Sequence, residues 1–293
     1  MRIKISHMPL YHGIHGHMAK TKKQIISDLK LIDVVIEILD ARIPVSSHNP
    51  DLEGIIKNKK RIILLNKSDL ADEKENQRWV EYFKKHNLKA VIVDANSGKG
   101  IDNSIKAIKE IMQDELQKEL AKGKARRVIR VLVLGIPNVG KSSYINRATK
   151  KVSAKVGNKP GVTVQKQWIR LDKDIEMLDT PGVLWPKFES EEVGLNLAYT
   201  GTIKDDILEK TEIAYNLLKF LFINYRDNII QRYKLDNIEN ITENNISDLM
   251  EIIGQKRGAL VSGGRVDLEK VSSIILDDFR TGKIGKISLE KVK

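Results

Sequence analysis

Cysteine is absent from the sequence, which excludes disulfide bonds and cysteine-ligated metal sites. No apolar segment approaches the roughly 20 residues that a membrane-spanning helix requires. The basic residues Arg2 and Lys4 are not followed by the apolar core and small-residue cleavage site of a secretory signal. We therefore predict a protein of the reducing cytoplasm that does not insert into a membrane.

The composition predicts a globular protein with an excess of positive charge. The 293 residues are enough for one large domain or two smaller ones, and 41% hydrophobic and 31% charged residues are ordinary values. The formal net charge of +12 would fit an anionic partner such as RNA, or an anionic membrane surface. A lysine-rich surface that only improves solubility would fit it equally well, so charge alone leaves the choice open.

The segment Gly135–Ser142 has the sequence GIPNVGKS, which matches the phosphate-loop pattern G-x-x-x-x-G-K-[ST]. The apolar run 131–134 precedes it and the helix-compatible run 142–149 follows, as a phosphate loop requires. Backbone N–H groups of such a loop bind phosphate oxygens, Lys141 supplies charge for the β- and γ-phosphates, and the Ser142 hydroxyl is placed to bind magnesium. The phosphate contacts are therefore expected from Asn138, Val139, Gly140, Lys141, Ser142 and Ser143. The alternative is an ordinary glycine-containing turn.

A second motif, NKSD at residues 66–69, follows the predicted buried strand 61–65. The carboxylate of Asp69 can accept two hydrogen bonds from guanine, and adenine lacks that pair of donors, so the motif selects GTP over ATP. Asn66 and Lys67 are expected to tie this loop to the phosphate loop and to cover the base. After the predicted strand 90–93, Asp94, Ala95 and Asn96 are assigned by position to a second base-contacting loop.

Two further segments have the character of nucleotide switches. The segment KPGVT at 159–163 contains Thr163, which can bind magnesium only when the γ-phosphate is present. A predicted hairpin of strands 167–171 and 175–178 ends in DTPG, the D-x-x-G motif, where Asp179 would support magnesium and the Gly182 N–H would contact the γ-phosphate.

The order of these motifs along the chain is unusual for a GTPase, because NKSD precedes the phosphate loop. A circular permutation explains it: one doubly wound, mostly parallel sheet, with its original ends joined through the basic linker 122–130 and the chain cut after D-x-x-G. Helices are predicted at 20–31, 49–58, 73–86 and 102–120, and a strand at 34–39.

Beyond Glu191 the pattern becomes helical throughout, at 193–200, 207–225, 229–233, 246–253 and 268–279. We predict an N-terminal arm at 1–19, a permuted GTPase domain at 20–188 and an all-helical domain at 189–293. Basic, glycine-containing segments at 256–258 and 262–265 would suit contacts with RNA phosphates, and they would equally suit a plain helix–helix connection.

Together these motifs resemble the circularly permuted GTPases of ribosome assembly, and within them the ribosome biogenesis GTPase A group. The resemblance covers nearly the whole chain from Gly16 and rests on GHMAK (16–20), DARIP (40–44), NKSD (66–69), GIPNVGKS (135–142), KPGVT (159–163), DTPGVLWPKF (179–188), and GQKRG (254–258) before SGG (262–264). It implies a GTPase that is stimulated by the large ribosomal subunit, acts late in maturation of that subunit and binds its rRNA through the helical domain. The chain departs from the group at Ile14-His15, before GHM, and at Ala95.

Val183 follows DTPG at the place of the water-orienting glutamine in Ras-like proteins, so turnover of the isolated protein should be slow. His17, to which the resemblance also points, is the candidate for positioning the attacking water, because an imidazole can hydrogen-bond water near neutral pH. The alternative is a histidine that only packs or is solvated. Asn138 resembles the asparagine that holds potassium in potassium-activated GTPases, with simple capping of the loop as the alternative.

The resulting hypothesis is a monomeric, magnesium-dependent GTPase switch whose partner is the large-subunit precursor and its rRNA. A second hypothesis is a nucleotide-dependent RNA-binding scaffold in which hydrolysis is incidental. A third, a GTPase of RNA modification or membrane trafficking, predicts no association with ribosomal particles.

Overall fold

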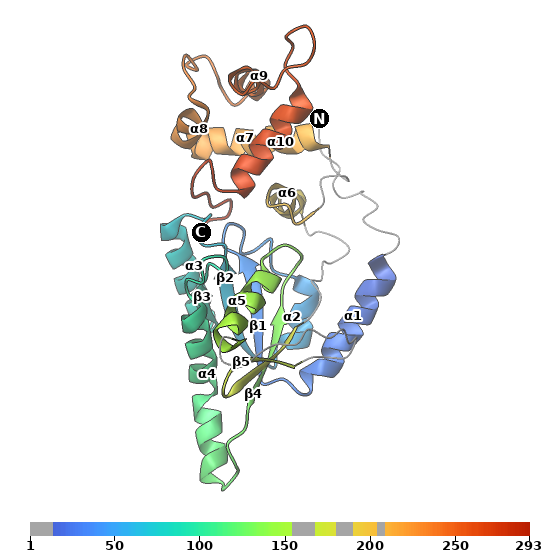
Figure 1. Cartoon of the computed structure of the whole chain (residues 1–293), viewed down its shortest axis with the longest axis vertical. Helices are drawn as coiled ribbons and strands as arrows, with labels where there is room; N and C mark the ends of the chain where they lie inside the picture. The colour runs from blue at the N-terminus through green and yellow to red at the C-terminus, as the bar shows by residue number, and fades with distance from the viewer. Residues whose placement is uncertain (1–13, 154–167, 180–189, 204–208) are drawn as a thin grey trace.

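A computed structural model of the chain describes residues 14–153, 168–179, 190–203 and 209–293. Within these ranges one six-stranded sheet occupies the first part of the chain, and helices joined by loops follow it (Figure 1). The strands are β1 (Val34–Asp40), β2 (Lys60–Asn66), β3 (Lys89–Ile92), β4 (Ile129–Leu134), β5 (Trp168–Asp172) and β6 (Ile175–Asp179). The helices of this part are α1 (Ile14–Leu29), α2 (Pro50–Ile56), α3 (Glu73–Lys85), α4 (Ile101–Ala121) and α5 (Lys141–Ser153).

The sheet has the order β3-β2-β1-β4-β6-β5, and every neighbouring pair is parallel except β5 and β6. The strand that leads into the phosphate loop, β4, therefore lies in the interior of the sheet between β1 and β6. Its register with β1 pairs Val34 with Val131, although the two residues belong to distant parts of the chain. The permuted, doubly wound sheet and the antiparallel hairpin at its edge are confirmed.

Helices cover both faces of the sheet, which explains why its strands are apolar on both sides. Helices α4 and α5 pack on one face, and α1, α2 and α3 pack on the other. On the second face, α1 and α2 contribute Ile25, Leu29, Leu52 and Ile56, and α3 contributes Trp79 and Phe83. Both faces of the sheet are thus covered by a packed apolar core, from which the loops at its end extend.

Most helix boundaries lie within three residues of the predicted ones; α5 runs four residues past its predicted end, and the start of α1 departs further. Helix α1 begins at Ile14 rather than at residue 20, so its first turns contain the GHM segment. Gly16 is the only poor helix former there, and the Met18-Ala19-Lys20 run that follows favours helix. The start of α3 is fixed more sharply, because the side chain of Asp72 accepts the N–H groups of Lys74 and Glu75.

The C-terminal part is helical, as predicted. It contains α6 (Glu191–Tyr199), α7 (Lys210–Asn224), α8 (Arg226–Tyr233), α9 (Ile246–Lys256) and α10 (Leu268–Arg280). Helices α7 and α10 pack together at its centre, with α9 against both. Within the described ranges, none of the helices is long and apolar enough to cross a bilayer.

After α10 the chain returns to the sheet, and the C-terminus lies at the junction of the two parts (Figure 1). The N–H of Ile287 donates to the carbonyl of Leu70 at 2.9 Å, and the N–H of Leu289 donates to the carbonyl of Arg42 at 3.0 Å. Within the helical part, Arg280 at the end of α10 donates to the carbonyls of Ala198 and Tyr199 at the end of α6. The last residues of the chain therefore connect the helical part to loops of the sheet.

Candidate functional site

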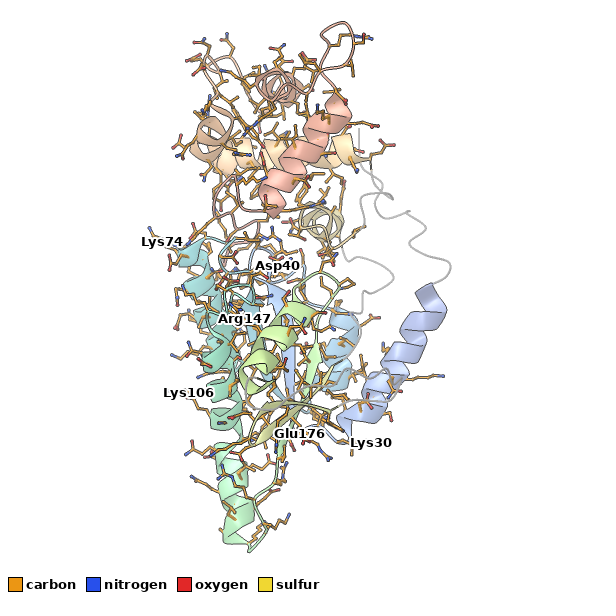
Figure 2. The ribbon with its side chains drawn as sticks, in the orientation of Figure 1. Lys30, Asp40, Lys74, Lys106, Arg147 and Glu176 are labelled. Carbon is orange, nitrogen blue, oxygen red and sulfur yellow. The ribbon has the colours of Figure 1, made fainter. Side chains whose placement is uncertain are left out.

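The phosphate loop, the NKSD motif and the second base-contacting loop meet at one end of the sheet. Parallel strands β1, β2, β3 and β4 all point to this end, so the loops that follow them come together there. Figure 2 shows Asp40 and Arg147 near this end, while Glu176 and Lys30 lie at the opposite one. The edge that carries the loops is therefore the candidate site.

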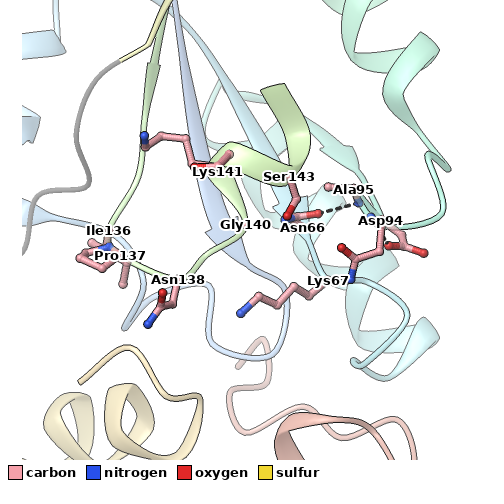
Figure 3. A pocket seen from close by; sticks show the side chains of 12 residues that line it. Asn66, Lys67, Asp94, Ala95, Ile136, Pro137, Asn138, Gly140, Lys141 and Ser143 are labelled. Carbon is pink, nitrogen blue, oxygen red and sulfur yellow. Dashed lines mark hydrogen bonds between the residues drawn. The ribbon is translucent and has the colours of Figure 1, made fainter. Parts of the chain in front are cut away.

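A cavity of about 460 Å³ opens between these loops, a volume in the range of nucleotide-sized pockets. Figure 3 shows its walls. It is lined by Asn66, Lys67, Asp94, Ala95, Asn96, Ile136, Pro137, Asn138, Gly140, Lys141, Ser142 and Ser143. Ten of these residues were predicted from the motifs, and Ile136 and Pro137 were missed because the variable positions of the pattern carry no fixed residue type.

Asn66 bonds to the phosphate loop, the contact expected from its motif, and also to the second base-contacting loop, which was not predicted. Its Nδ2 donates to the carbonyl of Val139 at 2.8 Å, and its Oδ1 accepts the N–H of Ala95 at 3.0 Å. The side chain is buried, so both bonds are shielded from water. Val139, which is also buried, thus contributes its carbonyl to the frame rather than a side chain to the cavity.

Gly140 must be glycine where it approaches Asn66. Its φ is +91°, and a Cβ there would overlap the Asn66 amide nitrogen. The phosphate loop therefore contacts the guanine-motif loop through backbone that no other residue type could provide.

The second base-contacting loop is held by its own aspartate. Oδ1 of Asp94 accepts the N–H groups of Asn96 at 2.9 Å and of Ser97 at 3.2 Å. Arg147 of α5 also donates to the carbonyl of Ser97. These bonds keep the backbone of Ala95 and Asn96 at the cavity wall.

Asp69 lies beside this cavity rather than in its wall. It lines a neighbouring cavity of about 590 Å³, and Asp94 lines both. Burial, and then the negative charge of Asp94, raise the pKa of the Asp69 carboxyl. A group that donates hydrogen bonds to Asp69 would relieve both effects, and the donor pair of a guanine base is such a group.

Lys67 makes a contact that the motif did not predict. Its backbone has the left-handed φ of 57°, and its Nζ lies 3.1 Å from Oδ2 of Asp40, in the turn after β1. The predicted tie to the phosphate loop is thus made by Asn66, while Lys67 lines the cavity and pairs with Asp40.

Asn138 joins the phosphate loop to the helical part of the chain. It has the left-handed φ of 62°, and its Nδ2 donates to the carbonyl of Gly201, after α6, at 2.8 Å. Sequence patterns could not reveal this contact, because Gly201 lies in a different part of the chain. A bound cation would need the amide oxygen of Asn138, which this bond does not use.

Several predicted residues lie outside what the structure describes. They are Thr163, Gly182, Val183 and the side chains of His17 and Asp179. The backbone of Asp179 ends β6 beside Val133, directly next to the strand that enters the phosphate loop. Ser142, the remaining predicted magnesium ligand, lines the cavity.

Comparison with known proteins agrees with this geometry. Residues 130–250 match the family described as 50S ribosome-binding GTPase. The ribosome biogenesis GTPase A of Bacillus licheniformis is 46% identical over 276 residues, which cover 94% of this chain and 96% of the relative. This chain belongs to the ribosome biogenesis GTPase A family.

Two solved structures are also similar to this chain. GNP-bound YlqF from T. maritima has a TM-score of 0.63 and 28% identity, covering 93% of this chain and 98% of that one. The GDP-bound structure of TM YlqF has a TM-score of 0.64 and 28% identity, covering 92% and 98%. The likeness extends over the sheet and the helical part alike.

Membership confirms three predictions: the family, the permuted P-loop fold and the enzyme class. The chain is a GTPase of ribosome biogenesis, so its substrate is GTP, and GTPases of this family usually require magnesium.

Proposed function

We propose that the protein assembles the large ribosomal subunit in the cytoplasm, and that GTP hydrolysis, stimulated by the ribosomal particle, releases it. The contact between Asn138 and the Gly201 carbonyl carries this proposal, because it links the phosphate loop directly to the helical part. A change in the phosphate loop on hydrolysis would alter this contact and shift the helical part. The net charge of +12 suits an rRNA partner, and the protein acts as a monomer away from membranes.

In this proposal the site residues have the roles that their motifs indicate. Lys141 stabilises the transferred phosphate, and magnesium is held by Ser142 with Thr163 and Asp179. The base is recognised by Asn66, Lys67, Asp69, Asp94, Ala95 and Asn96, and the phosphates are held by Asn138, Val139, Gly140, Lys141, Ser142, Ser143 and Gly182.

The connection between α9 and α10 is the proposed rRNA contact. Arg265 is exposed, as are the apolar side chains of Leu260 (45%) and Val261 (43%). Arg257 serves the fold instead, because it donates to the carbonyl of Arg232 at 2.9 Å. Arg265 is therefore the group that we propose for contact with phosphates.

Sedimentation with large ribosomal subunits tests the proposal. The protein should co-sediment with a non-hydrolysable GTP analogue, bind more weakly with GDP, and lose binding steeply as salt rises. Arg265→Ala should lower the salt slope by about one phosphate contact. Equal binding with GDP and the analogue would contradict the release switch.

A scaffold in which hydrolysis is incidental is the second candidate, and Val183 in place of a glutamine favours it. His17→Ala should lower ribosome-stimulated kcat and leave nucleotide affinity nearly unchanged. If this variant supports subunit assembly at the normal rate, the scaffold is correct and the switch is not. Equal stimulated kcat would remove His17 from the mechanism.

Asn138 is proposed to hold potassium beside the phosphates. Hydrolysis in potassium buffer should then exceed hydrolysis in sodium buffer, and Asn138→Ala should abolish the difference. Equal hydrolysis rates in both buffers would contradict the potassium site. The role of Asn138 would then be the hydrogen bond that it donates to the carbonyl of Gly201.

A further inference from the structure

The turn Asp40–Ile43 at the end of β1 has no role in the mechanism so far, yet it contains a buried charge cluster. The side chains of Asp40 and Arg42 are 2% and 1% exposed. Arg42 donates from Nε to Oδ1 of Asp40 at 3.0 Å and from Nη2 to Oδ2 at 2.8 Å. Lys67 of the guanine motif shares the same Oδ2 at 3.1 Å.

A buried carboxylate is stable only if its charge is paired. Burial acts to raise the pKa of Asp40, but the positive charges of Arg42 and Lys67 outweigh it and hold that pKa well below the ordinary value. Asp40 is therefore ionised at neutral pH, and it is a fixed anchor for the Lys67 ammonium group.

The Asp40 carboxylate fixes the position of the Lys67 ammonium group, and with it the course of the Lys67 side chain. The side chain of Lys67 is 20% exposed and lines the nucleotide cavity, along whose wall it extends in Figure 3. Its backbone is in the left-handed region, which is unfavourable for a residue with a Cβ. Pairing with Asp40 helps to hold the residue in this conformation, with its aliphatic part facing the cavity.

The C-terminal segment 287–290 holds the Asp40–Ile43 turn through backbone hydrogen bonds. The carbonyl of Arg42 accepts the N–H groups of Leu289 at 3.0 Å and Glu290 at 3.2 Å. The Glu290 carboxylate accepts the N–H groups of Val45 at 2.6 Å and Ser46 at 2.9 Å.

Helix α10 touches the same turn from the helical part. The Arg42 guanidinium lies 5.1 Å from the ring centre of Phe279, within the range of a cation–π contact. The turn thus lies between the guanine motif on one side and both α10 and the chain end on the other.

We propose that Asp40 and Arg42 are positioning residues for the guanine-reading loop, and that the C-terminal segment 287–290 keeps them in place. Nucleotide affinity then depends on residues that never touch the nucleotide. By linkage, bound nucleotide tightens the docking of the C-terminal segment by the same factor. The inference rests on the proposed role of residues 66–69 in base recognition.

Replacing the anchor tests it. Asp40→Asn should weaken GDP binding about tenfold or more, the usual cost of losing a charge-assisted hydrogen bond, and should raise KM for GTP while kcat stays unchanged. Fluorescent GDP titration measures the affinity. Asp278→Asn is the matched control, because Asp278 is also buried and bonded twice to an arginine, Arg232, but lies in the helical part.

The control should lower the melting temperature and leave GDP affinity within twofold of wild type. A double-mutant cycle then separates positioning from general destabilisation. In a Lys67→Met background, Asp40→Asn should cause little further loss of affinity, because its effect passes through Lys67. Additive losses would overturn the inference.

Glu290→Ala is a second variant, for use if Asp40→Asn does not melt cooperatively and is therefore misfolded. It leaves every Asp40 contact in place. It should weaken GDP binding about fivefold or more, a typical coupling between two sites. Wild-type affinity in Glu290→Ala would overturn the role of the C-terminal segment.

Asp69→Asn distinguishes a failure of the positioning role of Asp40 from a failure of the proposed role of residues 66–69 in base recognition. If residues 66–69 read the base, this variant should prefer xanthosine diphosphate over GDP. If it does not, the assignment of the loop fails. If it does, and Asp40→Asn still binds GDP like wild type, only the positioning role fails.

Discussion

Gly140→Ala should break the frame of the nucleotide site while leaving the rest of the protein folded. Gly140 has a φ of +91°, and an added Cβ would come closer to the Asn66 Nδ2 than the 3.0 Å that real Cβ atoms respect. The alanine therefore strains its own backbone and also displaces Asn66 from its bonds to Val139 and Ala95.

The size of the effect follows from these two costs. A left-handed alanine costs about 1–2 kcal/mol, and each of the two Asn66 hydrogen bonds contributes about 1 kcal/mol. In the nucleotide-free variant the loop can relax into a less strained conformation. Nucleotide binding requires the original conformation, so most of this free energy is lost from binding and little from folding stability. A total of roughly 3 kcal/mol corresponds to GDP binding more than a hundredfold weaker.

Titration with a fluorescent GDP analogue measures this loss, and thermal melting followed by circular dichroism checks the fold. Gly123→Ala is the matched control, since Gly123 also has a positive φ of +76° but nothing within 4 Å of an added Cβ. It should bind GDP like wild type. An affinity of Gly140→Ala within twofold of wild type would refute the collision with Asn66.

Two further predictions concern stability. Tyr144→Phe should cost about 1 kcal/mol of unfolding free energy in urea melts, because the buried hydroxyl, whose pKa burial raises to about 12, loses its bond to Ser104. His48→Gln should change how the free energy of unfolding varies with pH. Burial acts to lower the pKa of His48, but the hydrogen bond and the negative charge of Glu37 act in the opposite direction and outweigh it, so the pKa lies above the ordinary histidine value of 6.5. The unfolding free energy of the wild type should therefore exceed that of the variant most at pH below 6.5. This difference should disappear as the pH rises through the folded-state pKa of His48. A difference in urea midpoint that does not vary with pH would contradict it.

The sheet could be predicted from the sequence because its strands are buried on both faces. The apolar run Val131–Leu134, and the run Val34–Leu39 with Glu37 as its one polar residue, carry that signal directly. The phosphate loop and the Asn66 tie were also predictable, since each depends on residues that are adjacent in the chain or fixed by a motif.

Polar contacts between distant segments could not be predicted. Asp40 pairs with Lys67, Asn138 with Gly201, and Glu290 with Ser46, and none of these pairs has a periodicity or spacing that marks it. The start of α1 was missed for a different reason, because a single glycine weakens a helix without ending it.

The permuted order also determines the sequence in which the site is synthesised. The guanine motif and the strands around it emerge from the translating ribosome first, and β1 has a central neighbour, β4, that is made only after α4 is complete. Closing this pairing across a long intervening segment adds little to the entropy cost, but it delays completion of the sheet. The nascent chain therefore carries its guanine-motif loop before it has a phosphate loop, and the two halves of the nucleotide site can meet only after translation has passed Ser143.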